Sequence, residues 1–401
     1  MLQIYIYVRI MKTRLFFYSF IVFICGLHIS IAQQSKDIDK TSNTPNPRII
    51  TNVRTVEELS SDPVNVKRID LTRKELTVFP KEILACVNVE ELTLSNNKLT
   101  SIPNEISQLT KLKRLLLRSN ELTTLPASIK NLAELQLLDV SNNKIITMPS
   151  LSGMPALQRL MVSNNQLSSA GISFDNIPEL YDIDISQNNF DELPDLSKLP
   201  KLAVLNASKN KIKVIPSYVS LLNNLLTLVI SENAISTFPK EFYSLKLLTR
   251  LDISKNNMSS ISNEIIGLSN LTSADFSSNG ISKIPAEFFK MPNLQNVDIS
   301  NNEIVELPEI DSTCQFRSFD ISNNKLAKLP NSINHLKGLS RFTLKNNKLT
   351  TIPAGIGSIT RLNTLDLTNN PLESLPVKEL RKLQDLRQLF IMEKPEQTQE
   401  K

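Results

Sequence analysis

Residues 89–103 read Val89-Glu-Glu-Leu92-Thr-Leu94-Ser-Asn-Asn97-Lys-Leu99-Thr-Ser-Ile102-Pro103, and this stretch is one copy of a pattern that fills most of the chain. The same order of apolar residues, followed by Asn and then Pro, recurs every 22 or 23 residues up to Pro376. A fixed period of this length is typical of a solenoid built from stacked supersecondary units. The fourteen copies begin at Val66, Val89, Leu112, Leu135, Leu157, Leu180, Leu202, Leu225, Leu248, Leu271, Leu294, Phe316, Leu339 and Leu362, and a truncated fifteenth strand begins at Leu386.

The apolar residues at the start of each repeat predict a short β-strand. Leu92 and Leu94 alternate with polar residues, which is the periodicity of a strand with one face in a core. A single strand cannot bury its apolar side alone, so neighbouring repeats should stack into a parallel sheet over a continuous core. At about 4.8 Å per strand, fourteen strands give a sheet roughly 65 Å long.

An Asn follows the strand in thirteen of the fourteen repeats, and the first repeat has Lys74 instead. Because a side-chain amide both donates and accepts, a stacked column of Asn can satisfy backbone groups where the strand turns away. This predicted structural ladder comprises Asn97, Asn120, Asn143, Asn165, Asn188, Asn210, Asn233, Asn256, Asn279, Asn302, Asn324, Asn347 and Asn370.

The second half of each repeat predicts an extended return segment and a short helical turn. Pro follows the last apolar position in twelve repeats, and pairs such as Ile106 and Leu109 are spaced i, i+3. The repeats at Leu135, Leu180 and Leu294 have 22 residues and should shorten this arc by one residue. The repeat at Leu157 lacks the Pro, and we expect a local irregularity there.

The repeated pattern resembles that of the leucine-rich repeat family over roughly residues 53–392. The resemblance implies an α/β fold, a curved horseshoe solenoid with a parallel β-sheet on its concave face and short helical or 3-10 turns on its convex face. It also implies that the concave face binds a protein. Many extracellular animal members carry disulfide-bonded cysteine caps. This chain does not, because Cys86 and Cys314 lie ten repeats apart.

The segments outside the repeats suggest an export leader and two caps. Met11-Lys12-Thr-Arg14, the apolar run that follows it and Ser30-Ile31-Ala32 have the form of a signal peptide, with Met11 as a possible start. Membrane attachment is expected only through an uncleaved leader. The predicted segments are a leader at 1–32, a polar linker at 33–52, an N-terminal cap at 53–65, the repeats at 66–385, a C-terminal capping strand at 386–392 and a disordered tail at 393–401.

Composition argues against an enzyme and against a nucleic-acid-binding protein. The formal net charge is +5, and removing the three basic residues of the leader gives 5 − 3 = +2, with few aromatic residues and no Trp. His28 lies in the leader, so His335 is the single histidine left for acid–base catalysis. The sequence contains no metal-ligand motif and no Gly-rich phosphate loop, so we predict no catalytic residue, cofactor or metal.

Asp occupies the exposed middle position of the strand pattern, between its last two apolar residues, in eight repeats, including four successive ones at Asp252, Asp275, Asp298 and Asp320. Such a column could attract a cation or a basic partner. The favoured interpretation is that these residues are common fillers of the family that hydrogen-bond along the ladder, because a calcium site needs a convergent cage of oxygens.

Repeats three to eight replace these fillers with apolar and basic residues. Exposed apolar side chains beside Arg and Tyr are typical of a binding hot spot, although drift on an unused surface would give the same pattern. The predicted partner-binding residues are Lys113, Arg114, Leu116, Arg118, Leu137, Arg159, Met161, Tyr181, Val204, Leu226 and Val229. The face is therefore expected to be basic near its N-terminal end, apolar in the middle and acidic from Asp252 to Asp320.

These observations favour a non-enzymatic, monomeric protein, secreted or surface-tethered, that binds a protein partner of unknown identity. The repeat style and the missing cysteine caps also resemble cytoplasmic scaffolds of the Ras-signalling type, in which case the leader is an anchor or a mis-assigned start. A structural component of an envelope or matrix is a third interpretation, and it predicts self-association.

Overall fold

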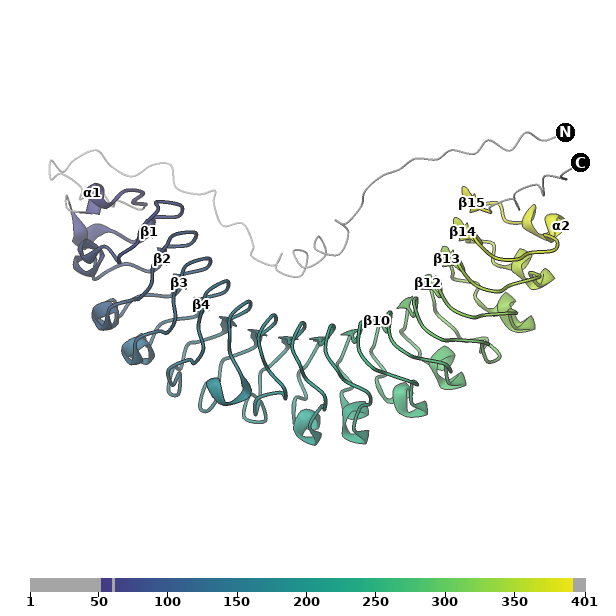
Figure 1. The fold of residues 1–401 in the computed structure, drawn as a ribbon, viewed down its shortest axis with the longest axis horizontal. Helices are drawn as coiled ribbons and strands as arrows, with labels where there is room; N and C mark the ends of the chain where they lie inside the picture. The colour runs from purple at the N-terminus through teal and green to yellow at the C-terminus, as the bar shows by residue number, and fades with distance from the viewer. Residues whose placement is uncertain (1–51, 60–61, 392–401) are drawn as a thin grey trace, which may run out of the picture. The chain divides into compact units, whose positions relative to one another are not determined.

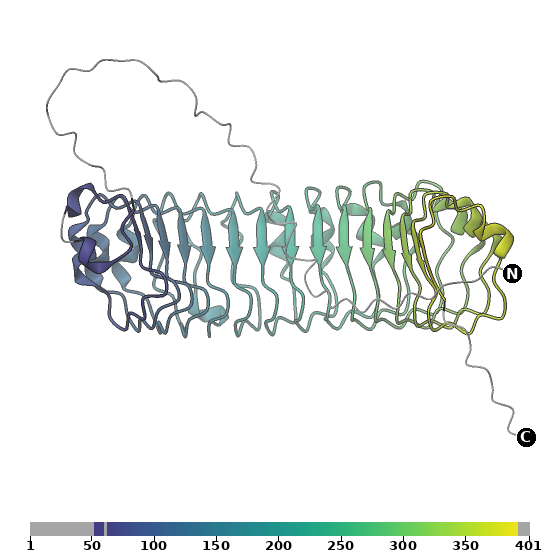
Figure 2. The ribbon, with the colours of Figure 1, turned by 90° about the horizontal axis from the view of Figure 1, so that it is seen from above.

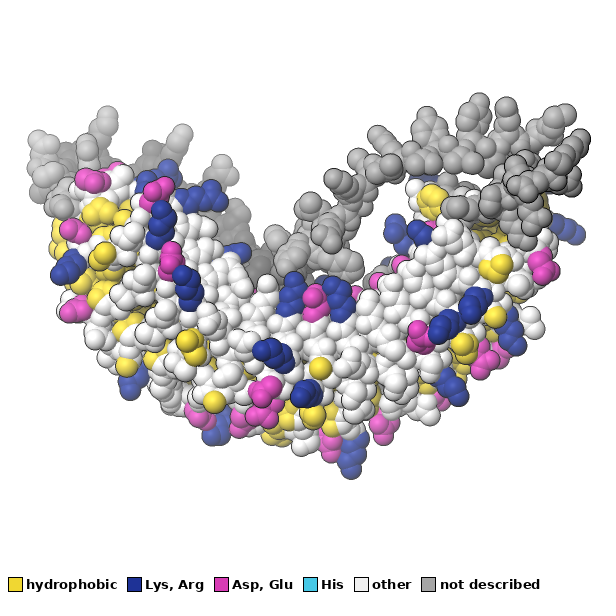
Figure 3. Space-filling view, viewed as in Figure 1, with side chains coloured by type: hydrophobic (Ala, Val, Ile, Leu, Met, Phe, Trp, Pro, Cys, Tyr) yellow, Lys and Arg dark blue, Asp and Glu magenta, His cyan; other side chains and the backbone are white. Residues whose placement is uncertain are grey.

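The computed structural model describes residues 52–59 and 62–391, which belong to one compact unit spanning Arg48–Lys401. The predicted leader, the linker up to residue 51 and the tail at 393–401 lie outside the described residues. The described residues form a curved row of coils with all strands on the inner side (Figure 1). From the same side, the space-filling view shows acidic and basic side chains scattered over this curved unit (Figure 3).

One sheet of fifteen parallel strands, ordered as in the sequence, runs through the unit (Figure 2). The fold predicted from the repeats is thereby confirmed. Each strand has three residues: β1 Arg68–Asp70, β2 Glu91–Thr93, β3 Arg114–Leu116, β4 Leu137–Asp139, β5 Arg159–Met161, β6 Asp182–Asp184, β7 Val204–Asn206, β8 Thr227–Val229, β9 Arg250–Asp252, β10 Ser273–Asp275, β11 Asn296–Asp298, β12 Ser318–Asp320, β13 Arg341–Thr343, β14 Thr364–Asp366 and β15 Gln388–Phe390.

The register places equivalent residues of successive repeats side by side. Arg114 pairs with Leu137, Leu115 with Leu138 and Leu116 with Asp139, and the other pairs follow the same rule. The central residue of each strand from β1 to β14 is buried, whereas the first and third residues are accessible on the inner face. The inner face therefore displays side chains in straight rows across the repeats.

Short 3-10 helices line the outer side of most coils (Figure 1). Most begin directly after a Pro, whose missing N–H costs nothing at a helix start. Ser262 replaces that Pro before η8, and its hydroxyl accepts a hydrogen bond from the Glu264 N–H instead. The helices are η1 Pro63–Asn65, η2 Lys81–Ala85, η3 Asn104–Gln108, η4 Ala127–Asn131, η5 Ser169–Gly171, η6 Ser217–Leu221, η7 Lys240–Ser244, η8 Asn263–Gly267, η9 Ala286–Lys290, η10 Asn331–His335 and η11 Ala354–Ser358.

Shortening a repeat by one residue has a larger effect than the sequence suggested. Among the described residues, no helix lies between β4 and β5, between β6 and β7 or between β11 and β12, which are the three 22-residue repeats. A turn of 3-10 helix needs about three residues. The shorter segment on the outer side of these repeats therefore contains turns but no helix. The repeat at Leu157 is irregular as expected, because its helix η5 comes early, at Ser169–Gly171.

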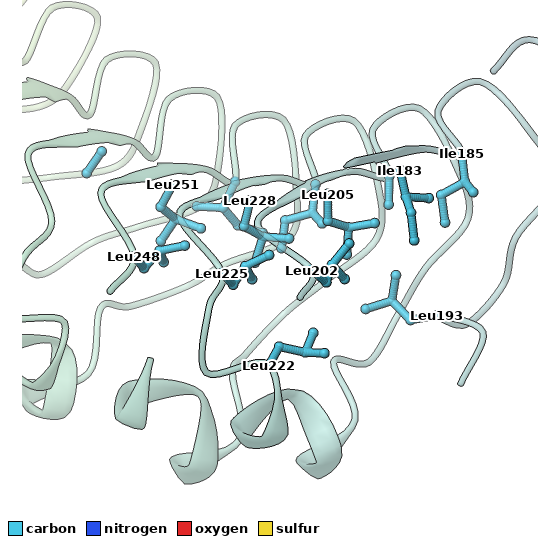
Figure 4. Close-up of a cluster of buried hydrophobic side chains, with 14 of the residues drawn as sticks. Ile183, Ile185, Leu193, Leu202, Leu205, Leu222, Leu225, Leu228, Leu248 and Leu251 are labelled. Carbon is cyan, nitrogen blue, oxygen red and sulfur yellow. The ribbon is translucent and has the colours of Figure 1, made fainter. Parts of the chain in front are cut away.

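A continuous apolar core fills the space between the sheet and the outer turns. Leu202, Leu205, Leu225 and Leu228 show the repeated arrangement, in which equivalent side chains of adjacent coils stack (Figure 4). Towards the C-terminal end the core becomes aromatic, with Phe288, Phe289, Phe316, Phe319 and Phe342 all buried. Cys86 and Cys314 are free and buried in the same core, and burial raises the pKa of each thiol to about 11.

The Asn column forms the corner that follows each strand. The Asn97 Oδ1 accepts from the backbone N–H of Lys74 at 2.9 Å, and its Nδ2 donates to the carbonyl oxygens of Leu71 at 2.8 Å and Leu94 at 2.9 Å. Each Asn therefore joins its own coil to the preceding one. In the described part of the chain, no buried side-chain nitrogen or oxygen lacks a hydrogen-bond partner.

The residue before each ladder position adopts a left-handed backbone conformation, which the sequence analysis did not predict. The φ angle is 59° at Asn96 and 53° at Lys255, for example. Asn tolerates this region and occupies several of these positions, whereas Lys255 and Glu232 adopt it because the corner on either side is fixed. This strain is repeated in every coil.

The two ends of the core are closed to different extents. At the N-terminal end, α1 (Val56–Leu59) buries Leu59, and Val53 bridges to Ile69 of β1. At the C-terminal end, α2 (Val377–Leu380) and the buried Leu383 cover the last coil. The final strand β15 forms the edge of the sheet, and its Leu389 and Phe390 side chains are 40% and 43% exposed.

Candidate functional site on the concave face

The candidate site is the inner face of the sheet from β3 to β8. The seven predicted apolar residues, here called the apolar zone, all lie on or beside these strands. Leu116 ends β3, Leu137 begins β4, Met161 ends β5, Tyr181 precedes β6, Val204 begins β7, and Leu226 and Val229 flank and end β8.

Exposure differs within the apolar zone. Tyr181 is 37% exposed and Leu226 is 42% exposed, whereas the other five side chains are partly buried among their neighbours. Tyr181 and Leu226 occupy the same row, directly before the strand, two coils apart. They are the two most accessible members and the best placed to insert into a partner.

The register shows that the apolar zone is a mosaic and not a continuous patch. Asp139 of β4 lies between Leu116 and Met161 in the third strand row. Asp182 lies between Arg159 and Val204 in the first row. A partner must therefore match carboxylates as well as apolar groups, which favours a specific protein surface over a generic apolar one.

Three of the four predicted basic residues are paired with carboxylates of neighbouring strands. The Lys113 Nζ lies 2.9 Å from Glu90 Oε2, the Arg114 Nε lies 3.8 Å from Glu91 Oε1, and the Arg159 Nε lies 2.8 Å from Asp182 Oδ2. The positive end expected from the sequence is largely neutralised. Arg118, two residues after the end of β3, has no carboxylate within ion-pair distance among the described residues.

The pKa values of two paired carboxylates, Glu90 and Asp182, shift in opposite directions. Hydrogen bonds from Lys113 and Lys67 lower the pKa of Glu90. Burial raises the pKa of Asp182, and the Arg159 guanidinium offsets this effect only in part. Glu90, Glu91 and Asp182 were not among the predicted site residues, although strict 22–23-residue spacing places them beside the basic residues.

The four aspartates from Asp252 to Asp320 lie in one row, as the register predicts. Their hydrogen bonds do not run along the row, so the expected hydrogen bonding between repeats is wrong. Each Asp Oδ1 accepts from the backbone N–H two residues later, as Asp252 does from Ser254 at 3.0 Å and Asp275 from Ser277 at 2.9 Å. No group of acidic, His or Cys side chains that could hold a metal occurs in the described residues.

Crowding of carboxylates is strongest at Asp275. Burial, followed by the charges of Asp298 and Asp252, raises the pKa of Asp275 to about 7. Because this value lies above the ordinary value of 3.8, the folded state holds the proton more tightly than the unfolded state. Stability therefore falls as pH rises from about 4 to about 7.

Asp275→Asn is expected to raise the free energy of unfolding by about 1–3 kcal/mol at pH 8, because the amide keeps the acceptor for Ser277 and removes the charge. Below about pH 4 the gain should vanish. Urea unfolding at the two pH values measures it. Asp139→Asn is the matched control, since Asp139 has Leu116 and Met161 as row neighbours. An equal gain in both variants would contradict the combination of burial and charge crowding at Asp275 as the cause.

His335 has a structural position on the outer side. Its Nδ1 lies 2.7 Å from the carbonyl oxygen of Ile310, in the preceding coil that lacks a helix. It lies in η10 on the outer side and not on the strands of the inner face. On the inner face, the hydroxyls of Ser141 and Ser254 donate to Asp139 and Asp252, two residues earlier.

Family models of the leucine-rich repeat match residues 64–122, 111–167 and 200–258, and a second leucine-rich repeat model matches residues 361–383. These matches agree with the parallel sheet, in which each strand from β2 to β14 is followed by the same Asn corner.

The chain belongs to the leucine-rich repeat family. Its fold is close to that of a leucine-rich repeat protein of Leptospira interrogans, with 29% identity, a TM-score of 0.67 and coverage of 84% of this chain and 99% of that one. The plant peptide hormone receptor RGFR1, solved in complex with RGF2, shows 28% identity and a TM-score of 0.68 over 85% of this chain and 60% of its own. An internalin of Listeria monocytogenes shares the fold at 19% identity, with a TM-score of 0.62 over 85% of this chain and 90% of that one.

The search against curated proteins gives no match. The matching leucine-rich repeat models and solved structures indicate no enzyme family. Among these solved structures, RGFR1 is a peptide hormone receptor. Across the residues that the structure describes, no helix has the length and apolar character needed to span a bilayer.

Proposed function

We propose that this leucine-rich repeat protein is a non-enzymatic, monomeric binding protein, secreted or surface-tethered, that holds a protein partner on the concave face between β3 and β8. It acts without a cofactor. The observation that carries the proposal is the pair Tyr181 and Leu226, two accessible apolar side chains held on a sheet that a continuous buried core keeps rigid. A preformed surface loses little conformational entropy on binding.

The charges around the apolar zone support recognition of a partner with a mixed surface. Arg118 is exposed, lies two residues after β3 and has no ion pair in the described residues. A carboxylate of the partner could therefore bind Arg118 without displacing a carboxylate of this chain. Arg159 and Lys113 are already paired, so they would add less. Arg and Tyr at the centre of such a surface are the residues that most often dominate binding energy.

The location outside the cytosol rests on the leader of the sequence and on the neighbours in structure. The receptor RGFR1 is a hormone receptor, and the internalin shares the fold with this chain. The charged segment Lys12–Arg14 followed by an apolar run supports export of the mature protein.

Arg118→Glu combined with Met161→Asp is expected to weaken partner binding by about a hundredfold or more, because each hot-spot residue contributes at least about 2 kcal/mol. The measurement is quantitative affinity capture from extracts of the native source with purified wild type and variant. The far-UV circular dichroism spectrum should stay unchanged, because Arg118 is exposed and Met161 is only partly buried.

Lys130→Glu combined with Val214→Asp is the control for that experiment. Lys130 lies in η4 on the outer side and Val214 is 66% exposed away from the strands. The control carries the same two changes of charge and polarity and should retain the partner. Loss of the partner in the control, or its retention in the inner-face variant, would contradict binding through the concave face.

A further inference from the structure

Three arginines converge at the C-terminal end of the sheet. Arg341 begins β13, Arg387 directly precedes β15, and Arg361 lies on the turn that leads into β14. All three side chains are exposed and line one open pocket of about 480 Å³, which Ser340, Thr364 and Asp385 also line. The three arginines occupy different positions of the repeat, so no periodic pattern in the sequence indicates this group.

The charge of this pocket is unbalanced. Among the described residues, none of the three guanidinium groups has a carboxylate oxygen within 4.0 Å, in contrast to Arg68, Arg114 and Arg159 near the other end. Asp385 is the single carboxylate of the lining. Three positive charges and one negative charge leave 3 − 1 = +2 in the pocket.

The neutral lining groups already have partners. The Ser340 hydroxyl donates to the carbonyl oxygen of Arg317 at 2.9 Å, and the Thr364 hydroxyl bonds to Gln388 Oε1 at 3.1 Å. Asn363 also lines the pocket and donates from Nδ2 to the carbonyl oxygen of Asp385 at 3.4 Å, so the guanidinium groups supply most of the N–H donors left for a ligand. Guanidinium presents a planar fork of N–H donors that fits the oxygen pairs of phosphate and sulfate.

We propose that this pocket binds a doubly charged tetrahedral oxyanion, a phosphate or a sulfate group. The net charge of +2 matches such a group better than a single carboxylate. The site is distinct from the proposed protein-binding surface, because five strand spacings of about 4.8 Å separate β8 from β13. It does not rest on the proposed function, and failure of either leaves the other standing.

Calorimetric titration of the full-length protein at low ionic strength tests the proposal, with inorganic phosphate, inorganic sulfate and glycerol phosphate as ligands and acetate as the singly charged control. We expect phosphate or sulfate to bind and acetate to bind at least tenfold more weakly. Tighter binding of glycerol phosphate than of inorganic phosphate would identify an esterified group as the ligand, and the reverse order would identify the free ion.

Variants decide whether the pocket holds the ion. Arg341→Gln, Arg361→Gln and Arg387→Gln should each weaken phosphate binding by about tenfold or more, since each removes charge-assisted hydrogen bonds. Arg250→Gln is the control, because Arg250 occupies in β9 the position of Arg341 in β13 but lies outside the pocket. Asp385→Asn should strengthen binding several-fold by removing the competing carboxylate.

The proposal fails if wild-type protein binds neither phosphate nor sulfate at millimolar concentration, or if acetate binds as well as they do. It also fails if Arg250→Gln weakens binding as much as the pocket variants do. Binding would then depend on the overall positive charge of the protein and not on the pocket. Circular dichroism of each variant shows whether the fold is intact. The exposed positions of the three arginines make unfolding an unexpected result.

Discussion

Replacing Asn256 by alanine should destabilise the solenoid by about 3–5 kcal/mol, because several buried backbone groups lose their partner at once. The Asn256 Oδ1 accepts from the Ile235 N–H at 2.9 Å, and its Nδ2 donates to the carbonyl oxygens of Ile230 at 3.0 Å and Ile253 at 3.1 Å. Alanine leaves these groups buried without hydrogen bonds. Urea unfolding followed by circular dichroism measures the loss.

Asn257→Ala is the control for Asn256→Ala. Asn257 is adjacent in sequence but exposed, and its side chain makes no hydrogen bond among the described residues. Its replacement should change stability by less than about 0.5 kcal/mol. Similar losses in the two variants would show that the Asn corner does not hold neighbouring coils together.

The second large effect is expected at Phe319, in the aromatic part of the core. Its ring stacks on Phe342 with centroids 5.6 Å apart and an interplanar angle of 9°, and it meets Phe316 edge-on at 5.3 Å. Phe319→Ala should cost about 3–5 kcal/mol, because it leaves a cavity between Phe316 of the same coil and Phe342 of the next, and the two coils cannot close it independently.

Phe319→Leu separates lost volume from lost aromatic contact. It keeps most of the volume and should cost about 1.5 kcal/mol or less. Thermal unfolding of both variants checks the difference. Because each coil contacts only its neighbours, partial unfolding of the C-terminal coils is the expected form of the transition. A loss below 1 kcal/mol for Phe319→Ala would contradict the tight packing of this region.

The fold could be predicted because one physical requirement repeats in every coil. Leu92 and Leu94 in one coil have equivalents in the next, so the period fixes both the parallel register and the buried side of each strand. The same period places Asn97 beside the backbone groups that it satisfies. These features depend on residues that are identical in kind from coil to coil.

Features that depend on differences between coils were harder to predict. The repeat that begins at Leu294 is one residue shorter than a 23-residue repeat and has no 3-10 helix, because such a helix has a minimum length. The pairing of Arg159 with Asp182 required the register of two particular strands. The pocket lined by Arg341, Arg361 and Arg387 joins residues from three different repeat positions, which no periodic pattern indicates.

The proposed function requires that a protein partner contact the concave face between β3 and β8. Site-specific photo-crosslinking in the native source detects such contact, with the crosslinking residue placed at Leu226 on the inner face or at Val214 away from the strands. Both side chains are exposed, at 42% and 66%. We expect a discrete crosslinked protein from position 226 and none from position 214. Crosslinking of the same protein from position 214, without any product from position 226, would contradict the proposed function.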